Sequence, residues 1–199
     1  MDFNIFLKEA IVSFILLFRS LIGFIFSPYK TMRKISLQKE LGQVWWIYII
    51  CILFFLNTGI VRSGYRGLMG ALFLYGVSIL FFSLLPSSDT YKERLTRMWI
   101  TWTHTLIPTC IWFYCNLLLF IILPPPRSIT FLGASFSIFY IAFSVSLLVW
   151  KLILVYLSLR FALRIHIYRI FYYMLLYIAL SAPLWVFLYN MGISRIPFV

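Results

Sequence analysis

Five long apolar segments, separated by short stretches that hold most of the charges, dominate this chain. Each segment is close to the roughly 20 residues that a helix needs to cross the hydrocarbon core of a bilayer. Because lipid offers no hydrogen bonds to exposed backbone groups, we expect these segments to be helices rather than open sheet. The predicted fold class is therefore all-α, a polytopic transmembrane helical bundle of about five spans. The predicted spans are residues 44–60, 68–85, 98–123, 131–157 and 170–189.

The composition also favours a membrane protein. Of the 199 residues, 63% are hydrophobic and 11% are charged, whereas soluble domains carry about a quarter charged residues. A soluble fold of this length could not bury so much apolar side chain, so the surplus is expected to face lipid. We predict a single membrane domain over residues 1–199, without a separate soluble domain.

The first apolar stretch, residues 4–27, is interrupted by Lys8, Glu9 and Arg19. A charge near the middle of a spanning helix costs about 2.5–3.5 kcal/mol. We therefore favour an interfacial N-terminal helix, with Lys8 and Arg19 toward the headgroups, over the alternative of a spanning helix. Pro28 should end this helix, and residues 29–40 are expected to form a cytoplasmic surface segment.

The net charge of +12 comes from 17 Lys and Arg against 5 Asp and Glu. Basic residues gather in the N-terminal part, in residues 86–97 and in residues 158–169. This bias predicts that these parts are cytoplasmic and that the C-terminus lies outside or in a lumen. No nucleic-acid-binding module is visible, so the expected partners of this charge are anionic membrane lipids rather than nucleic acid.

Catalysis is not expected. No acidic residue falls inside a predicted span, and the Walker A, GxSxG and HExxH patterns are missing. His104 and His166 lie in separate segments. Cys51, Cys110 and Cys115 lack CxxC spacing, and we interpret them as small apolar packing residues. We therefore predict no enzymatic activity, no metal site and no cofactor.

The third predicted span carries a polar face. Its members recur at three- and four-residue spacing and so share one side of a helix. They are Thr101, His104, Thr105, Pro108, Trp112, Cys115 and Asn116. The face could form a polar groove, or a surface for a partner helix or a lipid headgroup; alternatively, its side chains could hydrogen-bond to neighbouring helices inside the bundle. Pro108 is expected to kink the helix.

Basic side chains flanking the spans are candidate contacts for lipid headgroups or for a partner protein. They are Lys30, Arg33, Lys34, Arg160, Arg164 and Arg169. The last three, close to His166, could equally serve only to fix the topology. Lys151, inside the fourth predicted span, is expected to snorkel toward the cytoplasmic interface, with a buried functional charge as the alternative.

The order of these features resembles the Yip1 family of five-span membrane proteins. Ser27-Pro28-Tyr29-Lys30-Thr31-Met32-Arg33 precedes the first span, as a proline-containing segment does in prokaryotic members. Leu106-Ile107-Pro108, after a polar loop with Tyr91, is similar to the third helix of the family. The run from Trp150-Lys151-Leu152 to Leu159-Arg160, with the basic link and last span after it, is similar to the fourth and fifth helices. The likeness covers about residues 20–190 and rests on short, mostly hydrophobic motifs.

The resemblance implies a non-enzymatic helical bundle. Eukaryotic relatives are associated with vesicle traffic, Rab-type GTPases and membrane shaping at the ER and Golgi. The chain lacks their long cytosolic N-terminal region with its DLYGP-like motif, which argues against GTPase binding and favours a prokaryotic inner membrane over the ER or Golgi. The leading hypothesis is a non-catalytic subunit or scaffold that binds lipid and another integral membrane protein. The alternative is a small transporter or permease subunit for a lipid or apolar solute.

Overall fold

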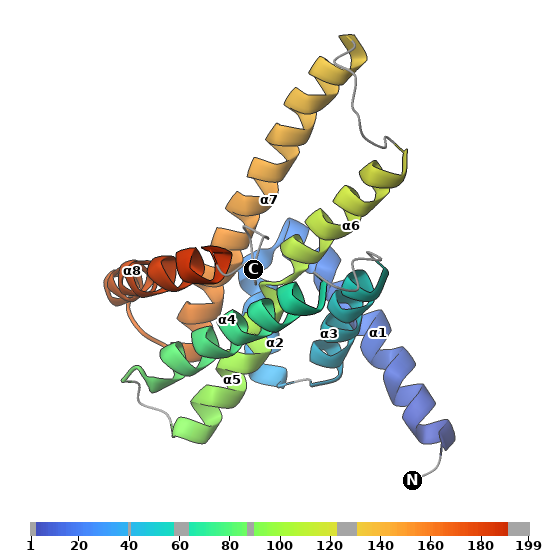
Figure 1. The fold of residues 1–199 in the computed structure, drawn as a ribbon. Helices are drawn as coiled ribbons and strands as arrows, with labels where there is room; N and C mark the ends of the chain where they lie inside the picture. Colours follow the sequence, from blue (N-terminus) through green and yellow to red (C-terminus); the bar gives the residue numbers. More distant parts are fainter. Residues whose placement is uncertain (1–2, 40, 58–63, 87–89, 123–130, 191–199) are drawn as a thin grey trace.

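The computed structural model describes residues 3–39, 41–57, 64–86, 90–122 and 131–190, and within them the chain forms eight helices and no strand (Figure 1). The prediction of an all-α fold is confirmed for this part of the chain. The helices are α1 (Phe3–Phe26), α2 (Pro28–Gln38), α3 (Leu41–Asn57), α4 (Gly64–Leu84), α5 (Tyr91–His104), α6 (Ile107–Ile122), α7 (Phe131–Leu163) and α8 (Ile167–Asn190).

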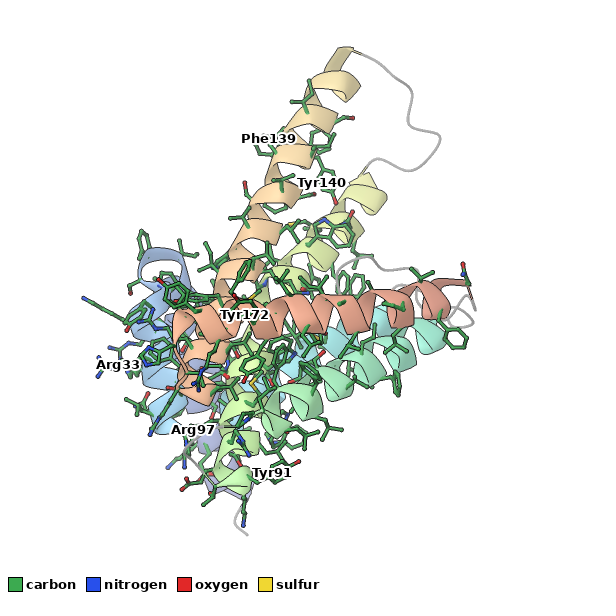
Figure 2. All side chains as sticks on the ribbon, turned by 90° about the vertical axis from the view of Figure 1, so that its left-hand side faces the viewer. Arg33, Tyr91, Arg97, Phe139, Tyr140 and Tyr172 are labelled. Carbon is green, nitrogen blue, oxygen red and sulfur yellow. The ribbon has the colours of Figure 1, made fainter. Side chains whose placement is uncertain are left out.

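Helix α5 lies at the centre of the fold. It packs against α7, α4, α2 and α3, and every residue from Ile100 to Thr105 is buried. α6 continues beside the long α7, and α4 and α8 lie across this pair rather than parallel to it (Figures 1 and 2). α1 packs against α3 and α2 on the side of the molecule away from α8 (Figure 1).

The surface of the described residues is more apolar than that of a soluble protein, and the interior contains several polar side chains beside its apolar core. The central helix α5 buries Thr101, Thr103 and His104 completely, each at 0% exposure. Large apolar and aromatic side chains lie outside instead, among them Phe139 and Tyr172, which are 68% and 69% exposed and project from α7 and α8 in Figure 2. Side chains of this kind are stable on the outside when lipid rather than water surrounds them.

Three segments of the described helices are long and apolar enough to cross a membrane: Leu7–Phe26, Phe136–Leu163 and Ile167–Leu184. Only 11%, 11% and 6% of the residues in their most apolar windows are buried. Leu41–Phe54 and Leu72–Leu84 are apolar but shorter. The structure therefore supports a membrane protein with three candidate spans in its described part, two fewer than the sequence predicts. One of the three is the N-terminal helix, for which we favoured an interfacial position.

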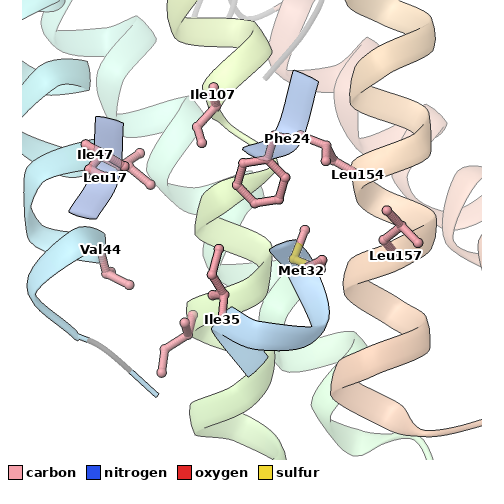
Figure 3. Packing of buried hydrophobic residues seen from close by; sticks show 10 residues of the cluster. Leu17, Phe24, Met32, Ile35, Val44, Ile47, Ile107, Leu154 and Leu157 are labelled. Carbon is pink, nitrogen blue, oxygen red and sulfur yellow. The ribbon is translucent and has the colours of Figure 1, made fainter. Parts of the chain in front are cut away.

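Two apolar clusters hold the helices together. The first joins α1, α2, α3, α5, α6 and α7, and Figure 3 shows Phe24, Met32 and Leu154 converging on it from α1, α2 and α7. The second joins α4, α5, α7 and α8 and is richer in aromatic rings. In it the Phe82 ring lies 5.2 Å from the Trp102 ring and 5.0 Å from the Tyr177 ring, measured between centroids.

Glycine sets the distance between α1 and α3. A Cβ atom on Gly42 would lie 2.2 Å from the Ser13 Oγ and 2.8 Å from the Ser13 Cβ. Only a residue without a side chain permits this approach, so α1 is seated against α3 at this point. The same reasoning holds for Gly23, where a Cβ would meet the Thr31 hydroxyl of α2 at 2.5 Å.

One predicted loop has a wrong boundary, and one predicted surface segment is helical. Residues 86–97 were expected to be a polar loop, but α5 begins at Tyr91. Thr90 at the N-cap and Glu93 three residues later form the Thr-x-x-Glu pattern typical of a helix start. The negative charge of Glu93 also interacts favourably with the positive N-terminal end of the helix dipole. Residues 29–40 are helical up to Gln38, with Met32 and Ile35 buried.

The third predicted span, residues 98–123, is not one helix. α5 ends at His104 and α6 begins at Ile107. Between them the Thr105 and Leu106 amides donate to carbonyls only three residues back, those of Trp102 and Thr103, each at 3.0 Å. Pro108 explains the break, because it has no N–H to donate to the His104 carbonyl and its ring would clash with that group.

The basic link between the last two helices is much shorter than predicted. α7 continues to Leu163, so Arg160 is helical and only residues 164–166 connect to α8. Arg164 ends α7 with a left-handed φ of 53°, and its amide donates to the Arg160 carbonyl at 3.1 Å. This is the usual way in which a helix satisfies its last carbonyls.

Candidate functional site

The predicted polar face of the third span is divided by the break after α5. Thr101, His104 and Thr105 lie in the dry interior around α5. Pro108, Trp112 and Asn116 lie on α6, where Pro108 is buried and the other two are half-buried. The side chains of the predicted face therefore do not form one continuous surface.

Thr101 joins α5 to α7. Its hydroxyl donates to the Arg97 carbonyl at 2.9 Å and accepts a hydrogen bond from the Ser158 hydroxyl at 2.9 Å. Both hydroxyls have 0% exposure. Thr105 turns back on its own helix and donates to the Trp102 carbonyl at 2.7 Å. The hydroxyls of this half are thus satisfied inside the protein.

His104 joins α5 to α3 and, through it, to α1. Its Nδ1 lies 2.8 Å from the Ile100 carbonyl, and its Nε2 lies 3.3 Å from the side-chain amide of Gln43. The same amide lies 3.1 Å from the Ser20 hydroxyl. A neutral ring that donates from Nδ1 can only accept at Nε2, so the Gln43 amide must turn its nitrogen toward the ring. The Phe24 ring covers His104 at 5.8 Å.

A second polar cluster on the other side of α5 was not predicted. The Trp99 Nε1 donates to the Tyr48 hydroxyl at 2.5 Å, and this hydroxyl donates to the Tyr75 hydroxyl at 2.9 Å. Tyr75 in turn lies 2.5 Å from the Thr103 hydroxyl. The four residues come from α3, α4 and α5. Their spacing in the sequence carries no signal, because three separate helices supply them.

On α6 the polar side chains face the first half of α7. The Trp112 Nε1 donates to the Ser144 hydroxyl at 3.2 Å. The Asn116 amide nitrogen donates to the Trp112 carbonyl at 2.8 Å, and its oxygen accepts a hydrogen bond from the Tyr140 hydroxyl. Of the two uses considered for the polar face, these contacts match hydrogen bonding between helices.

A cavity of about 20 Å³ lies between α6 and α7. Pro108, Thr109, Trp112, Ser144 and Lys151 form part of its wall. A cavity needs only about 10–15 Å³ to hold one water molecule. This space can therefore hold a water beside the half-buried Lys151, but it does not form a path through the protein.

The exposed cations of α2 and of the end of α7 lie on adjoining helices. α2 packs against α7; the Tyr29 ring contacts the Phe161 ring with 5.0 Å between centroids, and the Arg160 guanidinium lies 5.3 Å above the Tyr29 ring. Neither α2 nor the last turns of α7 contain an acidic residue. We call this region the basic surface; it comprises Lys30, Arg33, Lys34, Arg160 and Arg164.

All five cations of the basic surface are exposed, and Figure 2 shows Arg33 projecting outward from α2. Two segments that are about 130 residues apart in the sequence thus present one positive area. The sixth predicted cation, Arg169, is exposed on the first turn of α8 and takes no part in the contact between α2 and α7.

Cys51 and Cys110, interpreted above as packing residues, lie with their sulfur atoms 3.0 Å apart. The two thiols belong to α3 and α6, and both are free. Within the described residues, no three His, Cys, Asp or Glu side chains gather in a way that could hold a metal ion.

No protein-family model, curated protein or solved structure matches this chain.

Proposed function

We propose that the chain is a non-catalytic integral membrane protein that acts as a subunit or scaffold of a larger membrane complex and binds anionic lipid through its basic surface. The observation that carries the proposal is the packing of α2 against the C-terminal end of α7. Five exposed cations from two segments lie there beside helices whose apolar side chains face outward. Positive charge next to a lipid-facing helix is suited to phosphate headgroups.

The proposed topology has five spans, formed by α3, α4, the α5–α6 pair, α7 and α8, with α1 at the inner interface. The bias of basic residues places the basic surface in the cytoplasm and the C-terminus outside, and the resemblance to the Yip1 family favours a prokaryotic inner membrane. Because α4 and α8 lie across α7, these spans would differ widely in tilt. A reporter enzyme that works only outside the cytoplasm, fused to the C-terminus, should be active; an inactive fusion of normal abundance would contradict this topology.

A charge-matched pair of double variants tests the lipid contact. Arg33→Gln with Arg160→Gln removes two charges from the basic surface, whereas Lys92→Gln with Arg127→Gln removes two charges from other parts of the chain. At about 1 kcal/mol per cation, the first variant should lose about thirtyfold in affinity for phosphatidylglycerol, measured by native mass spectrometry in nanodiscs. Equal losses in both variants would show that only net charge matters and would contradict a specific surface.

Partner binding is tested by purifying the tagged protein from its native membrane in a mild detergent, with mass spectrometry of the proteins and lipids that accompany it. A stoichiometric membrane partner supports the subunit role. If only lipid accompanies the protein, the subunit role is wrong and a lipid-organising role remains.

A second candidate function is a small transporter or permease subunit for a lipid or apolar solute. The cavity beside Lys151 is the observation that favours it. The hydrogen bonds around α5 weigh against it, because they leave Thr101 and His104 dry. Movement of a fluorescent lipid between leaflets of liposomes that contain the protein would favour transport over the scaffold.

A further inference from the structure

The fold brings together two cysteines whose spacing in the sequence does not predict a pair. Cys51 and Cys110 are far apart in the chain, yet their sulfur atoms are 3.0 Å apart across the contact between α3 and α6. Cys110 is buried and Cys51 is half-buried. A disulfide has an S–S distance of about 2.05 Å, so an approach of about 1 Å would join the two helices.

An apolar cavity of about 280 Å³ lies on the Cys110 side of this pair, between α1, α3 and α6. Cys110 forms part of its wall. The other lining residues are Leu17, Leu21, Ile47, Ile50, Ile107, Ile111, Tyr114, Cys115 and Leu118. The Tyr114 hydroxyl donates to the Ile50 carbonyl at 2.9 Å, so it is already satisfied. The cavity therefore suits an apolar ring or chain rather than an ion or a polar solute.

The surroundings of the pair favour chemistry with a lipid-soluble reagent. Helix α1, whose Leu17 and Leu21 line the cavity, is apolar and mostly exposed on its outer side, so a molecule dissolved in the bilayer can reach the cavity more readily than a water-soluble one.

We propose that Cys51 and Cys110 are a redox-active dithiol, oxidised to a disulfide between α3 and α6 by a lipid-soluble quinone that binds in the apolar cavity. Two S–H bonds break and one S–S bond forms. The two electrons and two protons that the thiols release reduce the quinone to its hydroquinone. A quinone has the planar ring and apolar tail that the cavity suits, and it accepts two electrons without a further reactant. The proposal is independent of the lipid contact at the basic surface.

The test uses the full chain, reduced and placed in nanodiscs, with a benzoquinone that carries a decyl tail. After denaturation, remaining thiols are alkylated and counted by intact mass, and hydroquinone is measured by its absorbance. We expect two of the three thiols to be lost and one hydroquinone to form per chain. Before alkylation, the mass of the chain should fall by two hydrogen atoms. Peptide mapping should find the Cys51–Cys110 disulfide.

Cys115 provides the matched control, because it lines the same cavity on the same helix. Cys115→Ser should form the disulfide at the wild-type rate, whereas Cys51→Ser and Cys110→Ser should each keep both remaining thiols and form no hydroquinone. Leu118→Trp, at the exposed rim of the cavity, should slow oxidation by the quinone several-fold and leave the disulfide chemistry intact.

Three outcomes would overturn the proposal. All three thiols could survive the quinone. The mass could rise by one quinone, which would mean an adduct rather than a disulfide. Finally, oxidised glutathione at the same concentration could form the disulfide as fast as the quinone does, which would exclude the cavity as the route of the oxidant.

Discussion

The two halves of the third predicted span differ in where their polar groups lie. α5 buries the hydroxyls of Thr101 and Thr103 and the ring of His104, and their hydrogen-bond partners on other helices come from α3, α4 and α7. α6 is more apolar, and its polar side chains reach only two helices: Trp112 and Asn116 bond to α7, and Tyr114 bonds to α3, within the described residues. The difference teaches that polar residues within an apolar chain are kept from lipid by surrounding helices. Their burial reflects hydrogen-bond partners rather than a groove.

The largest expected effect comes from removing the centre of the α5 network. His104→Ala would leave a cavity in a site with 0% exposure and take away a partner of Gln43. We expect a loss of about 2–4 kcal/mol in the free energy of unfolding, measured by SDS titration of tryptophan fluorescence in micelles. His166→Ala, at an exposed position, should change it by less than about 0.5 kcal/mol. Equal effects would contradict the assignment of α5 to the core.

A smaller effect is expected for the contact between α5 and α7. Thr101→Val keeps the shape of the side chain but leaves the buried Ser158 hydroxyl without its partner, and we expect a cost of about 1–2 kcal/mol. Ser158→Ala removes that hydroxyl too, so adding it to Thr101→Val should cost little more. If the two effects simply add in the same titration, the hydrogen bond makes no contribution.

The smallest effect is expected at α6. Ser144 and Ser158 both lie on α7, but Ser144 accepts its hydrogen bond from the half-buried Trp112. Hydrogen bonds between membrane helices contribute about 0.6 kcal/mol on average, so Ser144→Ala should cost about 0.5 kcal/mol or less. Ser158→Ala should cost about 1 kcal/mol. A larger effect at Ser144 would reverse the comparison between the two halves.

Much of the fold is readable from the sequence, because long apolar runs and prolines are local signals. The first helix ends just before Pro28, and the apolar runs of α3, α4, α7 and α8 were found within a few residues of their boundaries, apart from the C-terminal end of α7. The start of α5 was missed although Thr90 and Glu93 mark it, because the charges nearby favoured a loop. The break before Pro108 was expected only as a kink.

The candidate site could be predicted only in part. Helical spacing places Thr101 and His104 on one face, and both side chains are buried on α5. It could not show that the helix is interrupted between His104 and Ile107. Partners such as Gln43, Tyr48 and Cys51 come from helices far away in the sequence, and no local pattern identifies them. The spacing of residues along the chain predicts which side chains share one face of a helix. Their partners on other helices depend on how the helices pack.

The length of α7 has a consequence for the membrane itself. At 1.5 Å per residue, the apolar 28-residue segment Phe136–Leu163 is about 42 Å long, whereas the hydrocarbon core is about 30 Å thick. A helix of this length must tilt by about 45°, project from the bilayer or thicken the lipid around it. The protein should therefore be sensitive to acyl-chain length and be more stable in thick bilayers than in thin ones.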